Sequence, residues 1–263
     1  MRNTLLLLLG TIFLTGCEIR EEMHFNADGS GSYEIGFDMS EMMKMGNGSD
    51  SVPPSKSIDT LINFAEFLDR KKDSIAQLPK GEQDKLEAMR PLRFSMKVND
   101  EQQQMDMRLG YAFETLDDIS KFAEAVKTAN IKELDQIMDP MSNMTGMSAE
   151  PDTIGQKQDG LTDFFSMSKS FNTTFNASGF SRTITQEAIV EMQKKKDTTL
   201  QEDDPFANMI RFKQVYKFPF RVKSVSNPHA KILSDFKGVE LEANMYEANN
   251  DPEFFNIEVV FEQ

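Results

Sequence analysis

The chain has 263 residues, and its 43 acidic and 29 basic residues give a formal net charge of −14. This acidity argues against a nucleic-acid partner, because phosphate backbones are bound through lysine and arginine. It also argues against attachment to anionic headgroups through a basic patch. The single cysteine excludes an internal disulfide, so we expect an apolar core to hold the fold together.

Residues 1–17 have the form of a bacterial export signal. Arg2 supplies a positive start, and Leu5–Leu14 is an apolar run shorter than the roughly 20 residues that cross a bilayer as a helix. The run ends in Leu14-Thr15-Gly16-Cys17, which resembles the lipobox of bacterial lipoproteins. The resemblance implies that residues 1–16 are removed and that Cys17 is acylated on its thiol and its new amino group. An ordinary signal peptide with an accidental cysteine is the alternative.

A β-hairpin is predicted directly after Cys17. Ile19, Met23 and Phe25 alternate with polar residues, and Tyr33–Met39 repeats the alternation after an Asp28-Gly29 turn. Since this leaves almost no linker, we expect the folded body to lie close to the bilayer. Removal of residues 1–16, which contain one arginine and no acidic residue, leaves a charge near −15, against −14 for the whole chain.

The rest of an N-terminal part, 17–138, is predicted as helices around a second hairpin. Ser57 or Asp59 is expected to cap a helix that continues to Leu68, and Lys71–Arg90 is expected to form a helix broken near Pro79. The remaining predicted elements are the strands Leu92–Val98 and Met105–Phe113, a helix from Thr115 and a short helix Ile131–Met138.

Residues 139–162 are polar and rich in Met and Gly, and are predicted to form a loop or linker. A C-terminal part, 163–263, follows, and we expect it to pack with the N-terminal part as one globular unit. Its predicted elements are a hairpin (Met167–Phe175, Phe180–Ile184), a helix Gln186–Lys196, and the strands Met209–Phe218, Phe220–Val225, Val239–Met245 and Phe255–Phe261.

These elements predict an α+β fold, with antiparallel sheets built of hairpins and amphipathic helices packed on one face. The layout also resembles a group of bacterial lipoproteins built like the LppM domain. The resemblance rests on Cys17 followed at once by a strand, on the turn Asp28–Gly31, and on the late segment Phe218–Val222 followed by Ser226-Asn227-Pro228. It implies an envelope lipoprotein and assigns no active site.

The sequence shows no convincing catalytic, cofactor or metal site. Asn26–Ser32 faintly resembles a calcium loop, but Phe37 stands where the loop requires Glu. Methionines cluster at 39–45 and 138–147, and thioethers suit Cu(I), yet neither run has a His or Cys beside it. His24 and His229 each stand alone. We therefore expect neither an enzyme nor a resident metal or cofactor.

An Asp-Ser/Thr pattern recurs more often than composition predicts. It resembles the O-glycosylation sequon of Bacteroidetes envelope proteins, and it is equally good capping and turn chemistry. The candidate acceptor residues are Ser51, Thr60, Ser74, Thr153 and Thr198.

The sequence therefore predicts a protein of the cell envelope, anchored through acyl chains on Cys17, with the outer membrane as the expected location. The expected function is a non-enzymatic binding or assembly module that meets another envelope protein. The alternatives are a carrier of an apolar ligand such as a lipid, and a hydrolase of envelope glycans or peptides.

Overall fold

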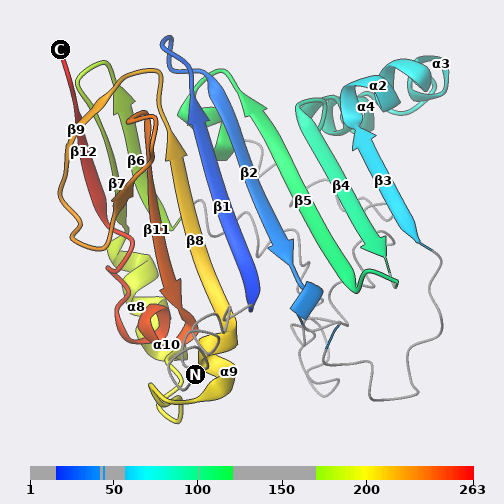
Figure 1. Ribbon diagram of the computed structural model, residues 1–263. Coiled ribbons are helices and arrows are strands. Elements are labelled where there is room, and N and C mark those ends of the chain that lie inside the picture. The colour runs from blue at the N-terminus through cyan, green and yellow to red at the C-terminus, as the bar shows by residue number, and fades with distance from the viewer. Residues whose placement is uncertain (1–15, 42–43, 45–56, 100, 121–169) are drawn as a thin grey trace, which may run out of the picture.

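The computed structural model describes residues 16–41, 44, 57–99, 101–120 and 170–263. These residues form two β-sheets with short helices at their ends (Figure 1), so the predicted α+β class is confirmed. The larger sheet has the strand order β10-β11-β8-β1-β2-β5-β4-β3. Its strands are β1 (Cys17–Phe25), β2 (Gly31–Asp38), β3 (Ile58–Asn63), β4 (Leu92–Asn99), β5 (Gln104–Phe113), β8 (Ile210–Lys217), β10 (Lys231–Ile232) and β11 (Gly238–Asn244).

Alternation of polar and apolar residues predicted the hairpins correctly. β1 pairs with β2, and β4 pairs with β5, each in antiparallel register. The apolar positions of these strands are buried, with Phe25, Ile35 and Leu92 each at most 1% exposed. The opposite face of the sheet therefore carries the polar residues, as expected for an antiparallel sheet with one solvated face.

The pairing of β1 with β8 was not predicted. The two strands are parallel, with Cys17 opposite Ile210 and His24 opposite Lys217, whereas the other pairings described are antiparallel. Parallel neighbours require a crossover connection rather than a tight turn. As a result, strands from the two ends of the chain lie side by side in one sheet.

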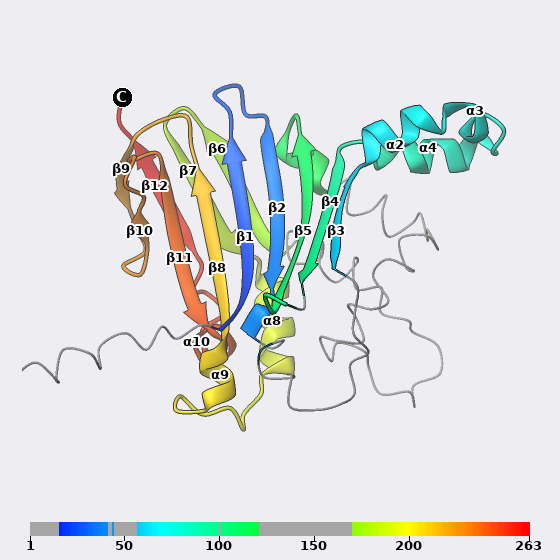
Figure 2. The same ribbon diagram turned by 45° about the vertical axis from the view of Figure 1, so that its right-hand side comes forward.

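The smaller sheet has the order β6-β7-β12-β9 and packs on one face of the larger sheet, at the β1–β8 side (Figures 1 and 2). Its strands are β6 (Phe171–Asn176), β7 (Gly179–Ile184), β9 (Val222–Val225) and β12 (Ile257–Phe261). Aromatic rings join the two sheets. The rings of Phe25 and Phe175 stack with centroids 4.4 Å apart, and Phe180 lies 4.7 Å from Tyr216. Such pairs contribute about 0.5–1.5 kcal/mol beyond the area they bury.

The helices lie at opposite ends of the sheets. Between β3 and β4, the helices α2 (Phe64–Arg70), α3 (Lys72–Ile75) and α4 (Lys80–Ala88) extend beyond the larger sheet, away from the end at which β1 starts (Figure 2). At the end where β1 starts, both views show α8 (Gln186–Lys195), α9 (Pro205–Met209) and α10 (Met245–Asn250). The break predicted near Pro79 is confirmed between α3 and α4.

The predicted helix from Ser57 or Asp59 to Leu68 is wrong in its first half. Ile58–Asn63 forms β3, with Ile62 opposite Phe94. Pairing with β4 outweighs the helical spacing of the apolar residues, and the β-branched residues of this segment suit a strand. The helix begins after Asn63, whose side chain accepts a hydrogen bond from Ala65 N–H (3.1 Å) and is therefore the actual N-cap.

Other predictions are met in part. The hairpin of β6 and β7 and the helix α8 are confirmed, but β6 starts at Phe171 rather than Met167. The helix predicted from Thr115 is seen at 116–120, and its continuation lies outside the described residues, as do 131–138 and 139–162. The helices α9 and α10 were missed.

Candidate functional site

Cys17 is the first residue of β1 and lies inside the fold. Its side chain is 6% exposed and shares the inward face of the strand with Glu21, Met23 and Phe25. The preceding Gly16 is pressed against α9, because a Cβ atom there would lie 2.2 Å from the carbonyl oxygen of Met209. The proposed attachment point is therefore part of the central sheet rather than of a tail.

We call the start of β1 together with α8, α9 and α10 the anchor end. Hydrogen bonds between side chains and backbone join its helices. Directly after α8, Asp197 N–H donates to Asn249 Oδ1 (3.0 Å), and Asn249 Nδ2 donates to the Asp197 carbonyl (2.9 Å). Asn244, the N-cap of α10, donates through Nδ2 to Asn208 Oδ1 of α9 (3.0 Å). The position of α8 relative to Cys17 is therefore set by specific contacts.

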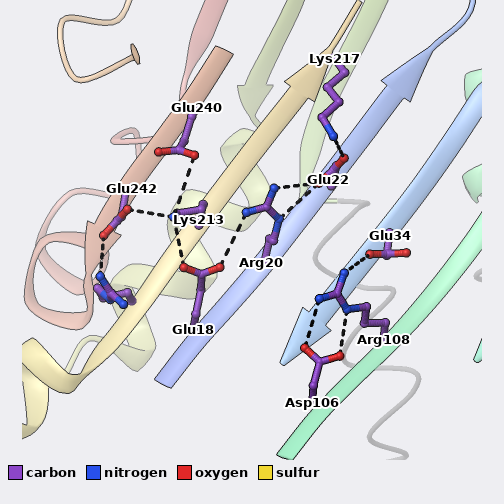
Figure 3. Close-up of polar contacts among 11 residues, drawn as sticks. Glu18, Arg20, Glu22, Glu34, Asp106, Arg108, Lys213, Lys217, Glu240 and Glu242 are labelled. Atoms are coloured by element: carbon purple, nitrogen blue, oxygen red, sulfur yellow. Dashed lines mark hydrogen bonds and ion pairs between the residues drawn. The ribbon is translucent and has the colours of Figure 1, made fainter. Parts of the chain in front are cut away.

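The outer face of the larger sheet carries a network of ion pairs, which we call the charged face (Figure 3). Lys213 lies at its centre, with Nζ 3.2 Å from Glu18 and 3.3 Å from Glu242. Arg20 pairs with Glu22 at 2.9 Å. The full set comprises Glu18, Arg20, Glu22, Glu34, Asp106, Arg108, Arg211, Lys213, Lys217, Glu240 and Glu242.

The charges of this face nearly cancel, because its five basic and six acidic side chains pair across five strands. The chain as a whole carries −14, so this surface is much closer to neutral than the rest of the molecule. A balanced surface of fixed charges does not attract one sign of ligand over long range. It can instead match a partner whose charges have a complementary arrangement.

Two pKa shifts show how strongly the pairs interact. Burial raises the pKa of Glu22, but hydrogen bonds from Lys217 and Arg20 outweigh this and leave the pKa below its ordinary value. Burial lowers the pKa of Lys213, and the nearby glutamates, Glu18 foremost, outweigh it and raise the pKa. Both shifts favour the charged forms, so these ion pairs persist at neutral pH.

A second polar cluster lies between the two sheets, on the other side of β1. Arg182 of β7 is 0% exposed and Glu21 of β1 is 2% exposed. Arg182 donates through Nη2 to Glu21 Oε1 (2.6 Å) and through Nη1 to the Tyr216 hydroxyl (3.1 Å). Tyr33 donates to the same Glu21 oxygen (2.7 Å), and Tyr216 donates to Gln214 (2.6 Å). We call these five residues the buried network.

The buried network is incomplete. Among the described residues, Glu21 Oε2 and Arg182 Nε have no hydrogen-bond partner although both atoms are buried. Burial lowers the pKa of Arg182, but Glu21, Tyr216 and Tyr33 together outweigh this and raise it, and burial raises the pKa of Tyr33 and Tyr216. With no exposed surface, Arg182 does not meet a dissolved ligand, so the network is structural.

The sequence carries a signal for this network in the inward positions of two charged residues. Glu21 lies on the apolar face of β1, and Arg182 stands between Phe180 and Ile184 on the buried face of β7. Two charged residues of opposite sign at inward positions predict a buried pair, because neither is stable alone in the core.

The candidate glycosylation residues are placed differently. Ser74 in α3 and Thr198 after α8 are exposed, whereas Thr60 is half-buried within β3. Ser51 and Thr153 lie outside the described residues. At Asp197 the turn interpretation fits, because its carboxylate accepts from Thr199 N–H (2.8 Å) and Thr199 Oγ1 (2.6 Å). Glycosylation stays a prediction.

The weak metal candidates gain no support from the geometry. Asp28 accepts from Ser30 N–H (3.0 Å) and Ser30 Oγ (2.7 Å), and Gly29 has φ 89°, so this segment is a hairpin turn. His229 stacks on Phe254 with centroids 4.8 Å apart. Within the described ranges, no group of three or more His, Cys, Asp or Glu side chains is placed to hold a metal ion. Met39 is buried, and the other clustered methionines lie outside those ranges.

The described helices include none with the length and apolar character needed to cross a bilayer.

Comparison with protein-family models and with curated proteins gave no match. Among solved structures, the chain is similar to the NMR structure of the folded domain of the Mycobacterium tuberculosis LppM protein, with a TM-score of 0.34, 11% identity, and coverage of 97% of this chain and 95% of that one. At this TM-score and identity, the likeness establishes neither fold nor function.

Proposed function

We propose that this protein is a lipid-anchored, non-enzymatic module of the bacterial cell envelope, attached through Cys17 and located at the outer membrane. One observation carries the proposal: the lipobox-like cysteine is the first residue of the central strand. Acyl chains on Cys17 would hold the sheet directly against the bilayer, with the charged face turned toward another envelope protein.

Metabolic labelling tests the anchor. Cells fed radiolabelled palmitate should yield labelled wild-type protein without residues 1–16, and Cys17→Ser should abolish both the label and the cleavage. The matched control is Cys17→Ser combined with Ser178→Cys, which places a thiol in the exposed β6–β7 turn. Label on the control would mean that any thiol is acylated, and unlabelled wild type would refute the anchor.

Site-specific photo-crosslinking in cells tests the binding module. A crosslinker at Ser95, which lies on the outward side of β4 beside the charged face, should give one discrete adduct with an envelope protein. The adduct should disappear when Lys213→Gln and Arg20→Gln are combined. A crosslinker at the exposed Val190 of α8 is the control and should not give the same adduct.

A different outcome would redirect the functional proposal. If native mass spectrometry of the purified protein shows a retained small lipophile and no crosslinked protein partner is found, the carrier function replaces the assembly module. An adduct that persists in the charge variant would show that the charged face is not the contact surface.

A further inference from the structure

The contacts of the buried network place α8 at the level of Cys17. β1 runs away from Cys17 toward Glu21, and β7 runs through Arg182 toward α8, with Glu21 and Arg182 joined at 2.6 Å. At about 3.3 Å per strand residue, Cys17 lies roughly 13 Å from Glu21, and Thr185, the N-cap of α8, lies roughly 10 Å from Arg182. Figures 1 and 2 both show α8 at the end of the molecule where β1 begins.

The side chains of α8 are more exposed to solvent than is usual for an amphipathic helix. The helix is described over its full length, and none of its residues is buried. Val190 is 40% exposed and Met192 is 39% exposed. Ala188, Ile189 and Met192 occupy one side of the helix, since residues three and four apart share a face. This apolar side is not fully covered by the fold.

Lys194, Lys195 and Lys196 follow the apolar residues and are all exposed. They end α8 in a chain with a net charge of −14, and they suit the phosphates of lipid headgroups. Lys194 also bonds to Glu191 at 2.7 Å, whereas Lys195 and Lys196 follow Met192 by three and four residues and therefore lie on its side of the helix. Apolar residues beside lysines are the composition of a helix that lies at a membrane surface.

We propose that α8 lies on the bilayer surface beside Cys17, with Met192 at the boundary between headgroups and acyl chains and Lys195 and Lys196, on the same side of the helix, on lipid phosphates. This inference rests on the proposed anchor. A helix this short binds a bilayer weakly by itself, but attachment at Cys17 makes its contact intramolecular, with a high effective concentration of lipid. The two hydrogen bonds between Asp197 and Asn249 keep α8 at the anchor end.

A fluorescence experiment on the full acylated protein tests this inference. Cys17 is the sole cysteine, so once it is acylated an introduced cysteine is the sole reactive thiol. Met192→Cys is labelled with an environment-sensitive fluorophore and the protein is placed in phosphatidylethanolamine–phosphatidylglycerol vesicles that contain nitroxide-labelled lipid. We expect loss of fluorescence at position 192. Leu78→Cys, 36% exposed between α3 and α4, is the matched control and should keep its fluorescence.

Charge variants test the lysines. Lys194→Gln, Lys195→Gln and Lys196→Gln together should reduce the loss of fluorescence at position 192. The same change in the other basic run, Arg70, Lys71 and Lys72, should leave it unaltered, because these exposed residues lie among the helices beyond β3.

The outcomes separate the two proposals. Protein that stays acylated and vesicle-bound but shows no quenching at position 192 would overturn the role of α8 and leave the anchor intact. Shielding of the label from water without quenching by the lipid nitroxide would assign α8 to a protein contact and would also overturn the inference. If Cys17 reacts with the fluorophore and the mass shows no acyl groups, the anchor fails, and the role of α8 fails with it.

Discussion

At the scale of single residues, the buried network joins the two sheets by charge. Taking an ion pair out of water costs several kcal/mol per ion, and the attraction between the ions offsets this only with good geometry. Here Glu21 has two donors on one oxygen and none among the described residues on the other. We infer that the pair adds little net stability, and that it selects the correct placement of β7 over β1.

Removal of one partner of this pair should destabilise the protein strongly. Arg182→Met leaves the Glu21 carboxylate buried without its cation, and we expect the free energy of unfolding to fall by about 3–5 kcal/mol. Arg182→Met combined with Glu21→Leu should recover much of the loss, as measured by urea denaturation. Arg221→Met is the control, since its ion pair with Glu262 is about half-exposed and is expected to contribute about 0–1 kcal/mol. A double variant as unstable as the single variant would contradict this account.

The buried tyrosines predict a loss of stability in alkali. Burial raises the pKa of Tyr33 and Tyr216 above the ordinary value of 10.0. Above that pH the unfolded chain loses these protons while the folded chain retains them. The contribution of the two protonated tyrosines to the free energy of unfolding is therefore complete below pH 10. It declines as the pH rises toward the pKa values of the folded state. We expect the free energy of unfolding to fall by about 1.4 kcal/mol per pH unit for each tyrosine. Urea unfolding between about pH 9 and about pH 11.5 measures this slope. An equal slope in Tyr216→Phe would contradict this assignment.

At the scale of elements, the sequence predicted structure well where one periodicity dominated. The alternating strands of the hairpins leave no ambiguity, and the glycine of the first turn adopts the positive φ that its Asp-Gly sequence indicates. The segment Ile58–Leu68 has apolar residues at helical spacing and β-branched residues as well, so local pattern did not decide between helix and strand. Pairing with β4, a tertiary contact, decided it.

The observed helix start can be tested at its cap. Asn63→Ala removes the acceptor for Ala65 N–H, and such losses cost about 1 kcal/mol. Hydrogen exchange should become faster for the amides of α2, Phe64–Arg70. Asp59→Ala, within β3, is the control at the cap that the sequence suggested. If Asp59→Ala accelerates amide exchange in α2 as much as Asn63→Ala does, the assignment of Asn63 as the cap is wrong.

At the scale of the whole molecule, the parallel pairing of β1 with β8 could not be predicted. Hairpin partners are close in sequence, whereas Cys17 and Ile210 meet only because the intervening elements fold as they do. For the same reason, the sequence did not show that Glu18 and Lys213 would share the charged face. The alternation places Glu21 and Arg182 at inward positions and so indicates a buried pair, but the geometry of their contact depends on how the second sheet packs on the first.

Cleavage of the chain within 139–162 tests whether its two parts are independent. β1 and β8 hydrogen-bond to each other, and Glu21 and Arg182 lie on opposite sides of the cut. After a protease site inserted in this segment is cut, we expect both fragments to stay associated in gel filtration. Each isolated fragment should lose cooperative unfolding, because the fragment 17–138 would keep Glu21 without its cation. Two fragments that separate and unfold cooperatively would show two independent domains.

Because β8 comes late in the chain, one side of β1 stays unpaired during much of synthesis. A polypeptide is synthesised from its N-terminus, so β1 and β2 are complete long before Ile210 is added. Throughout that interval one side of β1 presents unpaired N–H and C=O groups, which are a template for pairing with other chains. The native sheet cannot cover this edge until β8 has been synthesised, so any protection before that point has to come from outside the native sheet.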